Sequence, residues 1–210
     1  MDSTMDSTIK FDIDIVGAEF RQSYTESCQL KLDAYIRGYE QLNKFVKILG
    51  RVFHFVALKI GKHIAFLRKL QQINDNNNHY ETIEAMLAHE LQQLAAYSKK
   101  TGCHKLLQLH RGLPFAVSFI EEMILLPADS PVHAACLAAY DLNLKEYHPR
   151  LVQRMARYAM LSLPTKKELY RRMDVDMDLF DAQLAPRAAT ALKEIYHRTQ
   201  DIYERHFIFD

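Results

Sequence analysis

Apolar side chains recur at intervals of three and four residues along nearly the whole chain, and this spacing constrains the fold most strongly. It is the period of an α-helix that turns one face to a core. Breaks between the periodic stretches are few, because the 210 residues include 6 glycines and 6 prolines. All-β sandwiches and barrels need a turn about every ten residues. The sequence therefore predicts an all-α protein of about eight helices.

The expected helices follow one another with short connections. They cover about 27–42, 42–72, 80–99, 103–126, 131–145, 149–163, 166–173 and 186–206. Gly50 and Gly61 weaken the second of these helices locally. The asparagine-rich stretch at 74–78 and the acidic stretch at 174–181 are expected to be loops or short turns. We expect residues 1–24 to be a polar, flexible segment and residues 25–210 to form a single domain.

Composition and charge exclude several classes of protein. Hydrophobic residues are 49% and charged residues 25% of the chain, as in a soluble globular protein, and the formal net charge of +1 argues against nucleic-acid binding. The three scattered cysteines do not suit a disulfide framework or a zinc site and indicate a reducing compartment. The acidic start of the chain, Met1 to Thr8, lacks the features of a signal peptide. We expect a cytoplasmic protein without a membrane span.

Known catalytic patterns are incomplete in this chain. His89-Glu90 begins a zinc-protease pattern, but Gln93 stands where the second histidine is required. Glu194 and His197 form one Glu-x-x-His unit, whereas a di-iron bundle needs two and further glutamates. Neither a Gly-rich phosphate loop nor a nucleophile elbow is found. The sequence predicts no enzymatic activity, no cofactor and no metal site.

Two expected helices carry basic or amide side chains that run into phenylalanines along one side. In the second helix these residues are Phe55, Lys59, His63 and Phe66, and in the fourth they are His104, Gln108, Arg111, Phe115 and Phe119. An amphiphile needs such a surface, with polar donors for a headgroup and apolar walls for a tail. The alternative is that the basic residues form a solvated face and the phenylalanines form core.

A third feature is Tyr147-His148-Pro149. Proline favours the start of a helix, so His148 is expected at or beside an N-cap, where its ring can face a cavity. A single histidine of this kind is more often structural than functional.

Several segments together resemble the glycolipid transfer protein family. Leu107 to Leu113, followed by Phe119-Ile120, resembles the family's central helix, and Ala139 to His148 is similar to its Ala-Tyr…Lys-x-Tyr-His segment. Leu49 to Phe53 is similar to the family's entry into its second helix. Val152-Gln153 and Leu163-Pro164 lie at the expected places. The resemblance covers about residues 40–175.

The resemblance implies a two-layer helical sandwich that takes the chains of a sphingolipid between its layers and the headgroup at a surface site. It implies transfer of the lipid between membranes through the cytosol, without a cofactor or a chemical step. The expected partners are a sphingolipid or related lipid and a transient membrane surface, not a nucleic acid, and the protein is expected to be a monomer.

The expected headgroup site departs from the family pattern. Lys59 stands at the position of a family aspartate, and His63 replaces an asparagine or lysine. Gln108 replaces the tryptophan on which glycolipid binders stack the sugar, and His104 and Gln108 replace the arginine pair of phosphate binders. Arg111 and His148 are retained.

These replacements favour an anionic headgroup, such as phosphate or sulfate, over a neutral sugar. The candidate headgroup residues are Lys59, His63, His104, Gln108, Arg111 and His148. The candidate lining of the chain pocket is Phe55, Phe66, Leu109, Phe115, Phe119 and Tyr147. The competing hypothesis is a lipid sensor or protein-interaction module of the same fold that has lost sphingolipid transfer.

Overall fold

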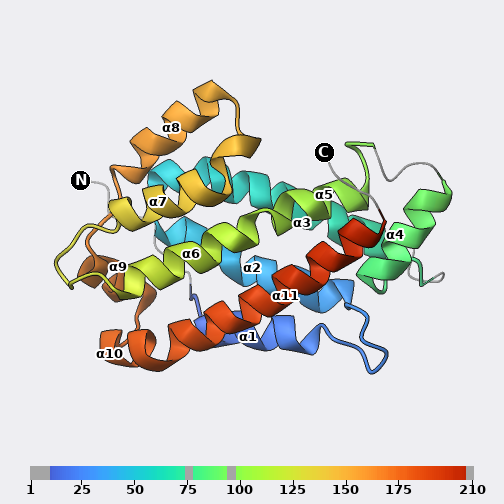
Figure 1. The fold of residues 1–210 in the computed structure, drawn as a ribbon, viewed down its shortest axis with the longest axis horizontal. Coiled ribbons are helices and arrows are strands. Elements are labelled where there is room, and N and C mark those ends of the chain that lie inside the picture. The colour runs from blue at the N-terminus through green and yellow to red at the C-terminus, as the bar shows by residue number, and fades with distance from the viewer. Residues whose placement is uncertain (1–9, 74–77, 94–97, 207–210) are drawn as a thin grey trace.

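The computed structural model describes residues 10–73, 78–93 and 98–206, and within these ranges it contains helices and no strand. Figure 1 shows the helices in their order along the chain. Their bounds are α1 Ile13–Gln22, α2 Leu32–Ile48, α3 His54–Ile73, α4 Ile83–Gln92, α5 Gly102–His110, α6 Gly112–Ile124, α7 His133–Asn143, α8 Arg150–Met160, α9 Lys166–Met173, α10 Met177–Leu179 and α11 Ala185–Arg205.

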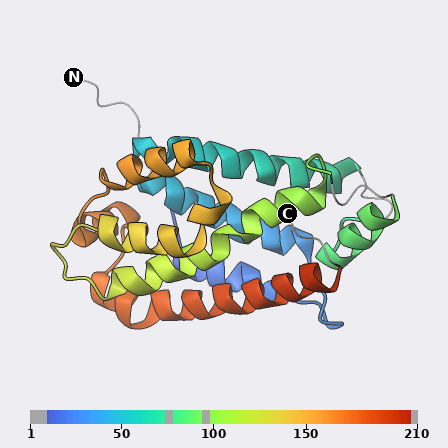
Figure 2. The same ribbon diagram turned by 45° about the horizontal axis from the view of Figure 1, so that its top comes forward.

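The helices form two layers, which confirms the predicted fold class (Figures 1 and 2). Helices α1, α2 and α3 pack side by side in one layer, and α11, α6 and α7 pack side by side in the other. Contacts between α1 and α11 close one edge of the sandwich, and contacts between α3 and α5 close the other.

The expectation of a flexible segment over residues 1–24 is wrong for its second half. Residues 1–9 lie outside the described ranges, but α1 packs against α2 and α11. The side chain of Asp12 accepts hydrogen bonds from the backbone of Asp14 and Ile15 and caps the helix. Val16 and Phe20 are buried on its inner face. The domain therefore begins before residue 25.

The expected helix over 42–72 is divided at Gly50. This glycine has a φ of 123°, which side-chain-bearing residues rarely adopt, and it separates α2 from α3. A short 3-10 turn, Arg51–Phe53, leads directly into α3. The break lets α3 fold back against α2 and places its polar side chains beside the interior.

The expected helix over 103–126 is also divided. Pro114 has no backbone N–H to donate to the carbonyl of His110, so the hydrogen-bond ladder is interrupted between α5 and α6. Arg111 sits at this joint. At the next residue, Gly112, no atom beyond the adjacent residues and the helix's own backbone lies within 4 Å of the place where a side chain would begin. There is therefore open space next to Arg111 in the chain.

The acidic stretch at 174–181 is more helical than expected. Asp176 caps α10, which continues through one π-helical turn, Phe180–Leu184, into α11. The buried ammonium of Lys166 anchors this region: it pairs with Asp181 at 2.6 Å and donates to the carbonyls of Ile124 and Leu126 at 2.8 and 2.9 Å. The π-helical turn is thereby tied to the C-terminus of α6.

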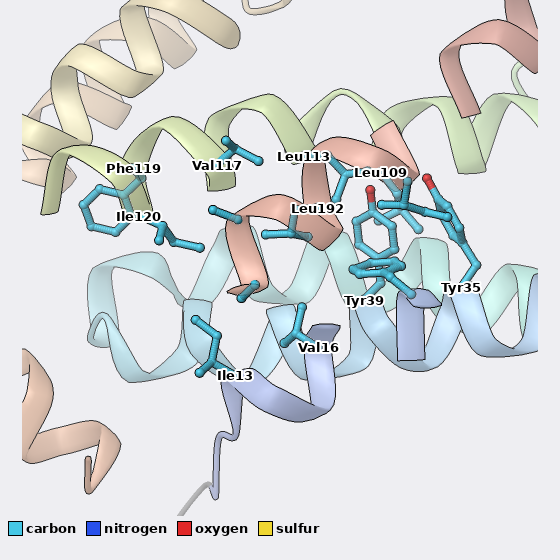
Figure 3. Packing of buried hydrophobic residues seen from close by; sticks show 14 of the residues in the cluster. Ile13, Val16, Tyr35, Tyr39, Leu109, Leu113, Val117, Phe119, Ile120 and Leu192 are labelled. Carbon is cyan, nitrogen blue, oxygen red and sulfur yellow. The ribbon is translucent and has the colours of Figure 1, made fainter. Parts of the chain in front are cut away.

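The inner faces of the two layers supply the core. Figure 3 shows Ile13 and Val16 of α1 and Phe119 and Ile120 of α6 pointing into the space between the layers. Leu192 of α11 lies between them. All five side chains are buried.

One ionisable group, His110 of α5, is enclosed in this core. Its ring is 1% exposed, stacks on Tyr196 with centroids 4.7 Å apart, and shares a hydrogen bond of 2.8 Å with the Gln200 side chain. Burial, helped by the charge of Arg111, lowers the pKa of His110 to about 4, although the hydrogen bond with Gln200 opposes the shift.

The unfolded chain binds a proton at His110 near pH 6.5, whereas the folded protein does so only near pH 4. Protonation therefore favours the unfolded state, and the free energy of unfolding should fall by roughly 3 kcal/mol as the pH decreases through this window. Urea unfolding at pH 7 and pH 4 checks this expectation, with His110→Gln as a variant that cannot titrate there. The variant should lose less stability over the window. Equal losses in both proteins would contradict this account of His110.

Candidate lipid-binding site

A cavity of about 200 Å³ lies between the two layers. Its walls come from both layers and are mostly apolar. The lining residues from the first layer and the turn after α2 are Phe11, Ile13, Val16, Tyr39, Leu42, Phe45, Val46, Leu49, Val56, Lys59, Ile60 and His63. The others are Gln108, Leu109, Arg111, Gly112, Phe115, Ala116, Phe119, Ile120, Met123, Leu144, Tyr147, His148, Phe180 and Leu192.

Five polar side chains of this lining form a rim: Lys59, His63, Gln108, Arg111 and His148. They come from α3, α5, the joint before α6, and the segment before α8. The described residues that line the cavity include no carboxylate, and they include two cations, Lys59 and Arg111.

Arg111 owes its place at the rim to the joint between α5 and α6. Its guanidinium lies over the ring of Tyr147, 4.3 Å from the centroid. Stacking of this kind is favourable and fixes the plane of the guanidinium.

Gln108 belongs to α5, and the N-terminus of this helix is fixed by a buried carboxylate. Glu90 accepts hydrogen bonds from the backbone N–H groups of Gly102 and Cys103 at 2.7 and 2.8 Å, and Thr101 caps the helix. Negative charge at this end of a helix is favourable. The rim residues of α5 therefore sit on an anchored element.

His148 is oriented by its neighbours. Its Nδ1 lies 3.0 Å from the hydroxyl of Tyr140, and its carbonyl accepts a hydrogen bond of 2.8 Å from the side chain of Gln153. Pro149 follows as the N-cap of α8, so His148 lies beside the cap, as the sequence predicts. Burial, and then the charge of Lys59, lowers the pKa of His148.

His63 has a buried ring nitrogen that is unsatisfied within the described residues. Among the described residues, its buried Nε2 has no hydrogen-bonding partner. Burial lowers the pKa of His63 to about 4, helped by the charges of Lys105, Lys59 and His104. The imidazole is therefore neutral near pH 7. A ligand that hydrogen-bonds with Nε2 of His63 would remove the free-energy cost of leaving this buried nitrogen without a partner.

The structure brings most of the predicted site residues together at one cavity. Of the candidate headgroup residues, Lys59, His63, Gln108, Arg111 and His148 line it, and so do Leu109, Phe115, Phe119 and Tyr147 of the candidate chain pocket. Their roles in lipid binding stay a prediction. His104 is close enough to His63 to lower its pKa but is not part of the lining.

The structure places Phe55 and Phe66 outside the lining. Phe55 is 44% exposed, and Phe66 lies beneath the ammonium of Lys105, 5.9 Å from the ring centroid. The residues of α3 that do face the cavity are Val56, Lys59, Ile60 and His63. At about 100° per residue their mean direction lies about 90° from Phe55. The two polar residues of the predicted stripe on α3, Lys59 and His63, therefore line the cavity, whereas its two phenylalanines do not.

Sequence reasoning missed the lining contributed by α1 and by the π-helical turn. Ile13 and Val16 lie in the segment expected to be flexible, and Phe180 lies in a stretch expected to be a loop or short turn. The spacing of Ile13, Val16 and Phe20 after the capping residue Asp12 is the signal that identifies α1 as an amphipathic helix.

The described part of the chain holds no cluster of three metal-ligating side chains and no helix long and apolar enough to cross a membrane.

Comparison with known proteins identifies the family. The family model of the glycolipid transfer protein matches residues 30–175, which is most of the chain. The chain belongs to the glycolipid transfer protein family. This confirms the resemblance drawn from its motifs.

Among the relatives, human ceramide-1-phosphate transfer protein is 28% identical over 211 residues, with 98% of each chain covered. Glycolipid transfer protein of Danio rerio is 23% identical over 193 residues, covering 89% of this chain and 90% of its own.

Solved structures of the family superimpose well. The structure of human ceramide-1-phosphate transfer protein in complex with ceramide-1-phosphate matches with a TM-score of 0.86 at 28% identity, covering 96% of this chain and 99% of that one. The apo-form of the mouse protein matches with a TM-score of 0.87 at 24% identity and shows the same fold. The two-layer sandwich is thus the fold of this family.

Replacement of Lys59 by alanine should raise the pKa of both His63 and His148, because the charge of Lys59 lowers both. Titration of the histidine ring protons by NMR measures the two values. Lys62→Ala is the matched control, since this exposed lysine of the same helix is outside the lining. A pKa that stays unchanged in Lys59→Ala, or one that falls, would show that the rim is not assembled as described.

Proposed function

We propose that this member of the family binds a sphingolipid with an anionic headgroup and transfers it between membranes. Phosphate is the preferred headgroup, as in ceramide-1-phosphate. The process is carriage without a chemical step, cofactor or metal, and we place it in the cytoplasm with a monomeric protein that meets membrane surfaces transiently.

The apolar cavity supports the part of the proposal that concerns the lipid chains. Burial of a hydrocarbon chain is worth about 0.8 kcal/mol per methylene. Moving a sixteen-carbon chain into water therefore costs on the order of 12 kcal/mol. A cavity walled by side chains such as Leu109, Phe115 and Phe119 replaces water with apolar contacts and removes most of this barrier.

The observation that carries the anionic headgroup is the presence of two permanent cations, Lys59 and Arg111, in a rim whose described lining has no carboxylate. The lysine supplies a point charge and the arginine a planar fork that suits phosphate oxygens. The unsatisfied Nε2 of His63 offers a further hydrogen bond. Because the hydroxyl of Tyr140 engages Nδ1 of His148, the other ring nitrogen of His148, Nε2, remains for a polar group of the lipid.

A neutral sugar headgroup fits this rim poorly. The chain contains no tryptophan on which a sugar could stack, and Gln108 occupies the expected stacking position. Without the stacking interaction, a sugar would have to displace water from two charged groups without neutralising them.

The competing function of a sensor or interaction module is less well supported. A protein that has given up lipid binding has no need to keep an apolar cavity open, because filling it would improve packing. In this chain the cavity remains.

Transfer of fluorescent ceramide-1-phosphate from donor to acceptor vesicles tests the proposal. Lys59→Ala and Arg111→Ala should each lower the transfer rate by about ten-fold or more, since a charged hydrogen bond is worth about 1.5–3 kcal/mol. Lys59→Asp, which restores the family's carboxylate, should lower it further for a phosphate headgroup. Lys62→Ala should stay within about two-fold of the parent, because its side chain lies outside the cavity.

Circular dichroism would confirm that each variant is folded. The proposal would be refuted if the parent protein extracted no anionic sphingolipid from vesicles. It would also be refuted if Lys59→Ala and Lys62→Ala behaved alike.

A further inference from the structure

The cavity has an inner end, away from the rim, where α1, α6 and the π-helical turn meet. From Arg111, at the joint before α6, the lining continues along α6 to Met123, twelve positions further, which is about 18 Å along a helix. Phe180 is tied to the C-terminal end of α6 through its neighbour Asp181, which pairs with Lys166, and Lys166 donates to the carbonyls of Ile124 and Leu126. Phe180 therefore lies at the inner end.

The ring of Phe180 is held in place from behind. It is 1% exposed and packs on the ring of Tyr170, with centroids 4.9 Å apart. The hydroxyl of Tyr170 donates to the carboxylate of Asp181 at 2.5 Å, and the ammonium of Lys166 binds the same carboxylate. Separating an ion pair whose lysine is 3% exposed is strongly unfavourable, so this pair anchors the backbone next to Phe180.

The backbone at this position is also unusual. Phe180 begins a π-helical turn, and such turns are rare and often occur at functional sites. One extra residue in the turn changes the direction of the side chains that follow relative to a regular helix.

We infer that Phe180 sets the greatest hydrocarbon chain length that the cavity accepts. The inference rests on the proposed lipid-binding function. A chain that enters from the rim runs along α6 and meets the ring of Phe180, which packs on Tyr170 beside an anchored backbone. Lipids with chains beyond this limit must leave terminal methylenes outside the apolar walls and should bind less well.

Two series of ceramide-1-phosphates test the inference, one with N-acyl chains from eight to twenty-four carbons and one with sphingoid chains of graded length. Affinity is measured by competition with a fluorescent analogue. Phe180→Ala should move the length limit of one of the two chains to longer homologues. For these homologues the affinity relative to the parent protein should rise by about four-fold for each methylene newly buried. Phe180→Trp should move the same limit to shorter ones.

Phe115→Ala is the matched control, because it removes the same atoms from the cavity wall away from the inner end. It should leave the limit unchanged. Equal length profiles for the parent and for both Phe180 variants would overturn the inference, and so would an equal shift in Phe115→Ala. If Phe180→Ala does not fold, the shift in Phe180→Trp decides. A parent protein that binds no ceramide-1-phosphate of any length would instead refute the proposed function, and the inference with it.

Discussion

The structure depends on one packing constraint, which is that α6 is apolar on more than one side and each side must be buried. Its neighbours α7 and α11 cover it laterally, and the side that carries Phe115, Phe119 and Met123 faces the first layer. The layers are joined at their edges by the contacts of α1 with α11 and of α3 with α5. An apolar space remains between the layers, and a hydrocarbon chain fills such a space better than water does.

The same apolar walls determine the electrostatics of the rim. Next to them the histidines lose hydration, so burial lowers the pKa of His63 and of His148 and holds both rings toward their neutral forms. A phosphate placed here meets two cations and neutral hydrogen-bonding groups in surroundings that weaken charge interactions less than water does. When it binds, it would favour protonation of the neighbouring histidines. Binding of such a headgroup would therefore be coupled to pH through the same residues.

Helical periodicity is enough to predict the fold class and most of the polar rim. Lys59, His63, Gln108 and Arg111 lie on predicted helical stripes, and the structure brings them to one cavity. Phe55 is wrongly assigned because helical spacing shows which residues share a side of the helix, but not which side faces the other layer. Tertiary packing decides that direction.

The other departures come from local backbone chemistry. The positive φ of Gly50 and the missing N–H of Pro114 divide helices that appear continuous by hydrophobic period. The π-helical turn at Phe180 has no sequence signal as simple as a proline, and its partner Lys166 is distant in sequence. The inner end of the cavity is therefore the part of the site that only the three-dimensional structure reveals.

The most direct test of the central claim is native mass spectrometry of the protein after purification from cells, followed by identification of the lipid it carries. The account predicts a one-to-one complex with a sphingolipid whose headgroup is a phosphate or another anion. A protein that carries only neutral glycolipids, or no lipid at all even after incubation with vesicles that contain anionic sphingolipids, would contradict it.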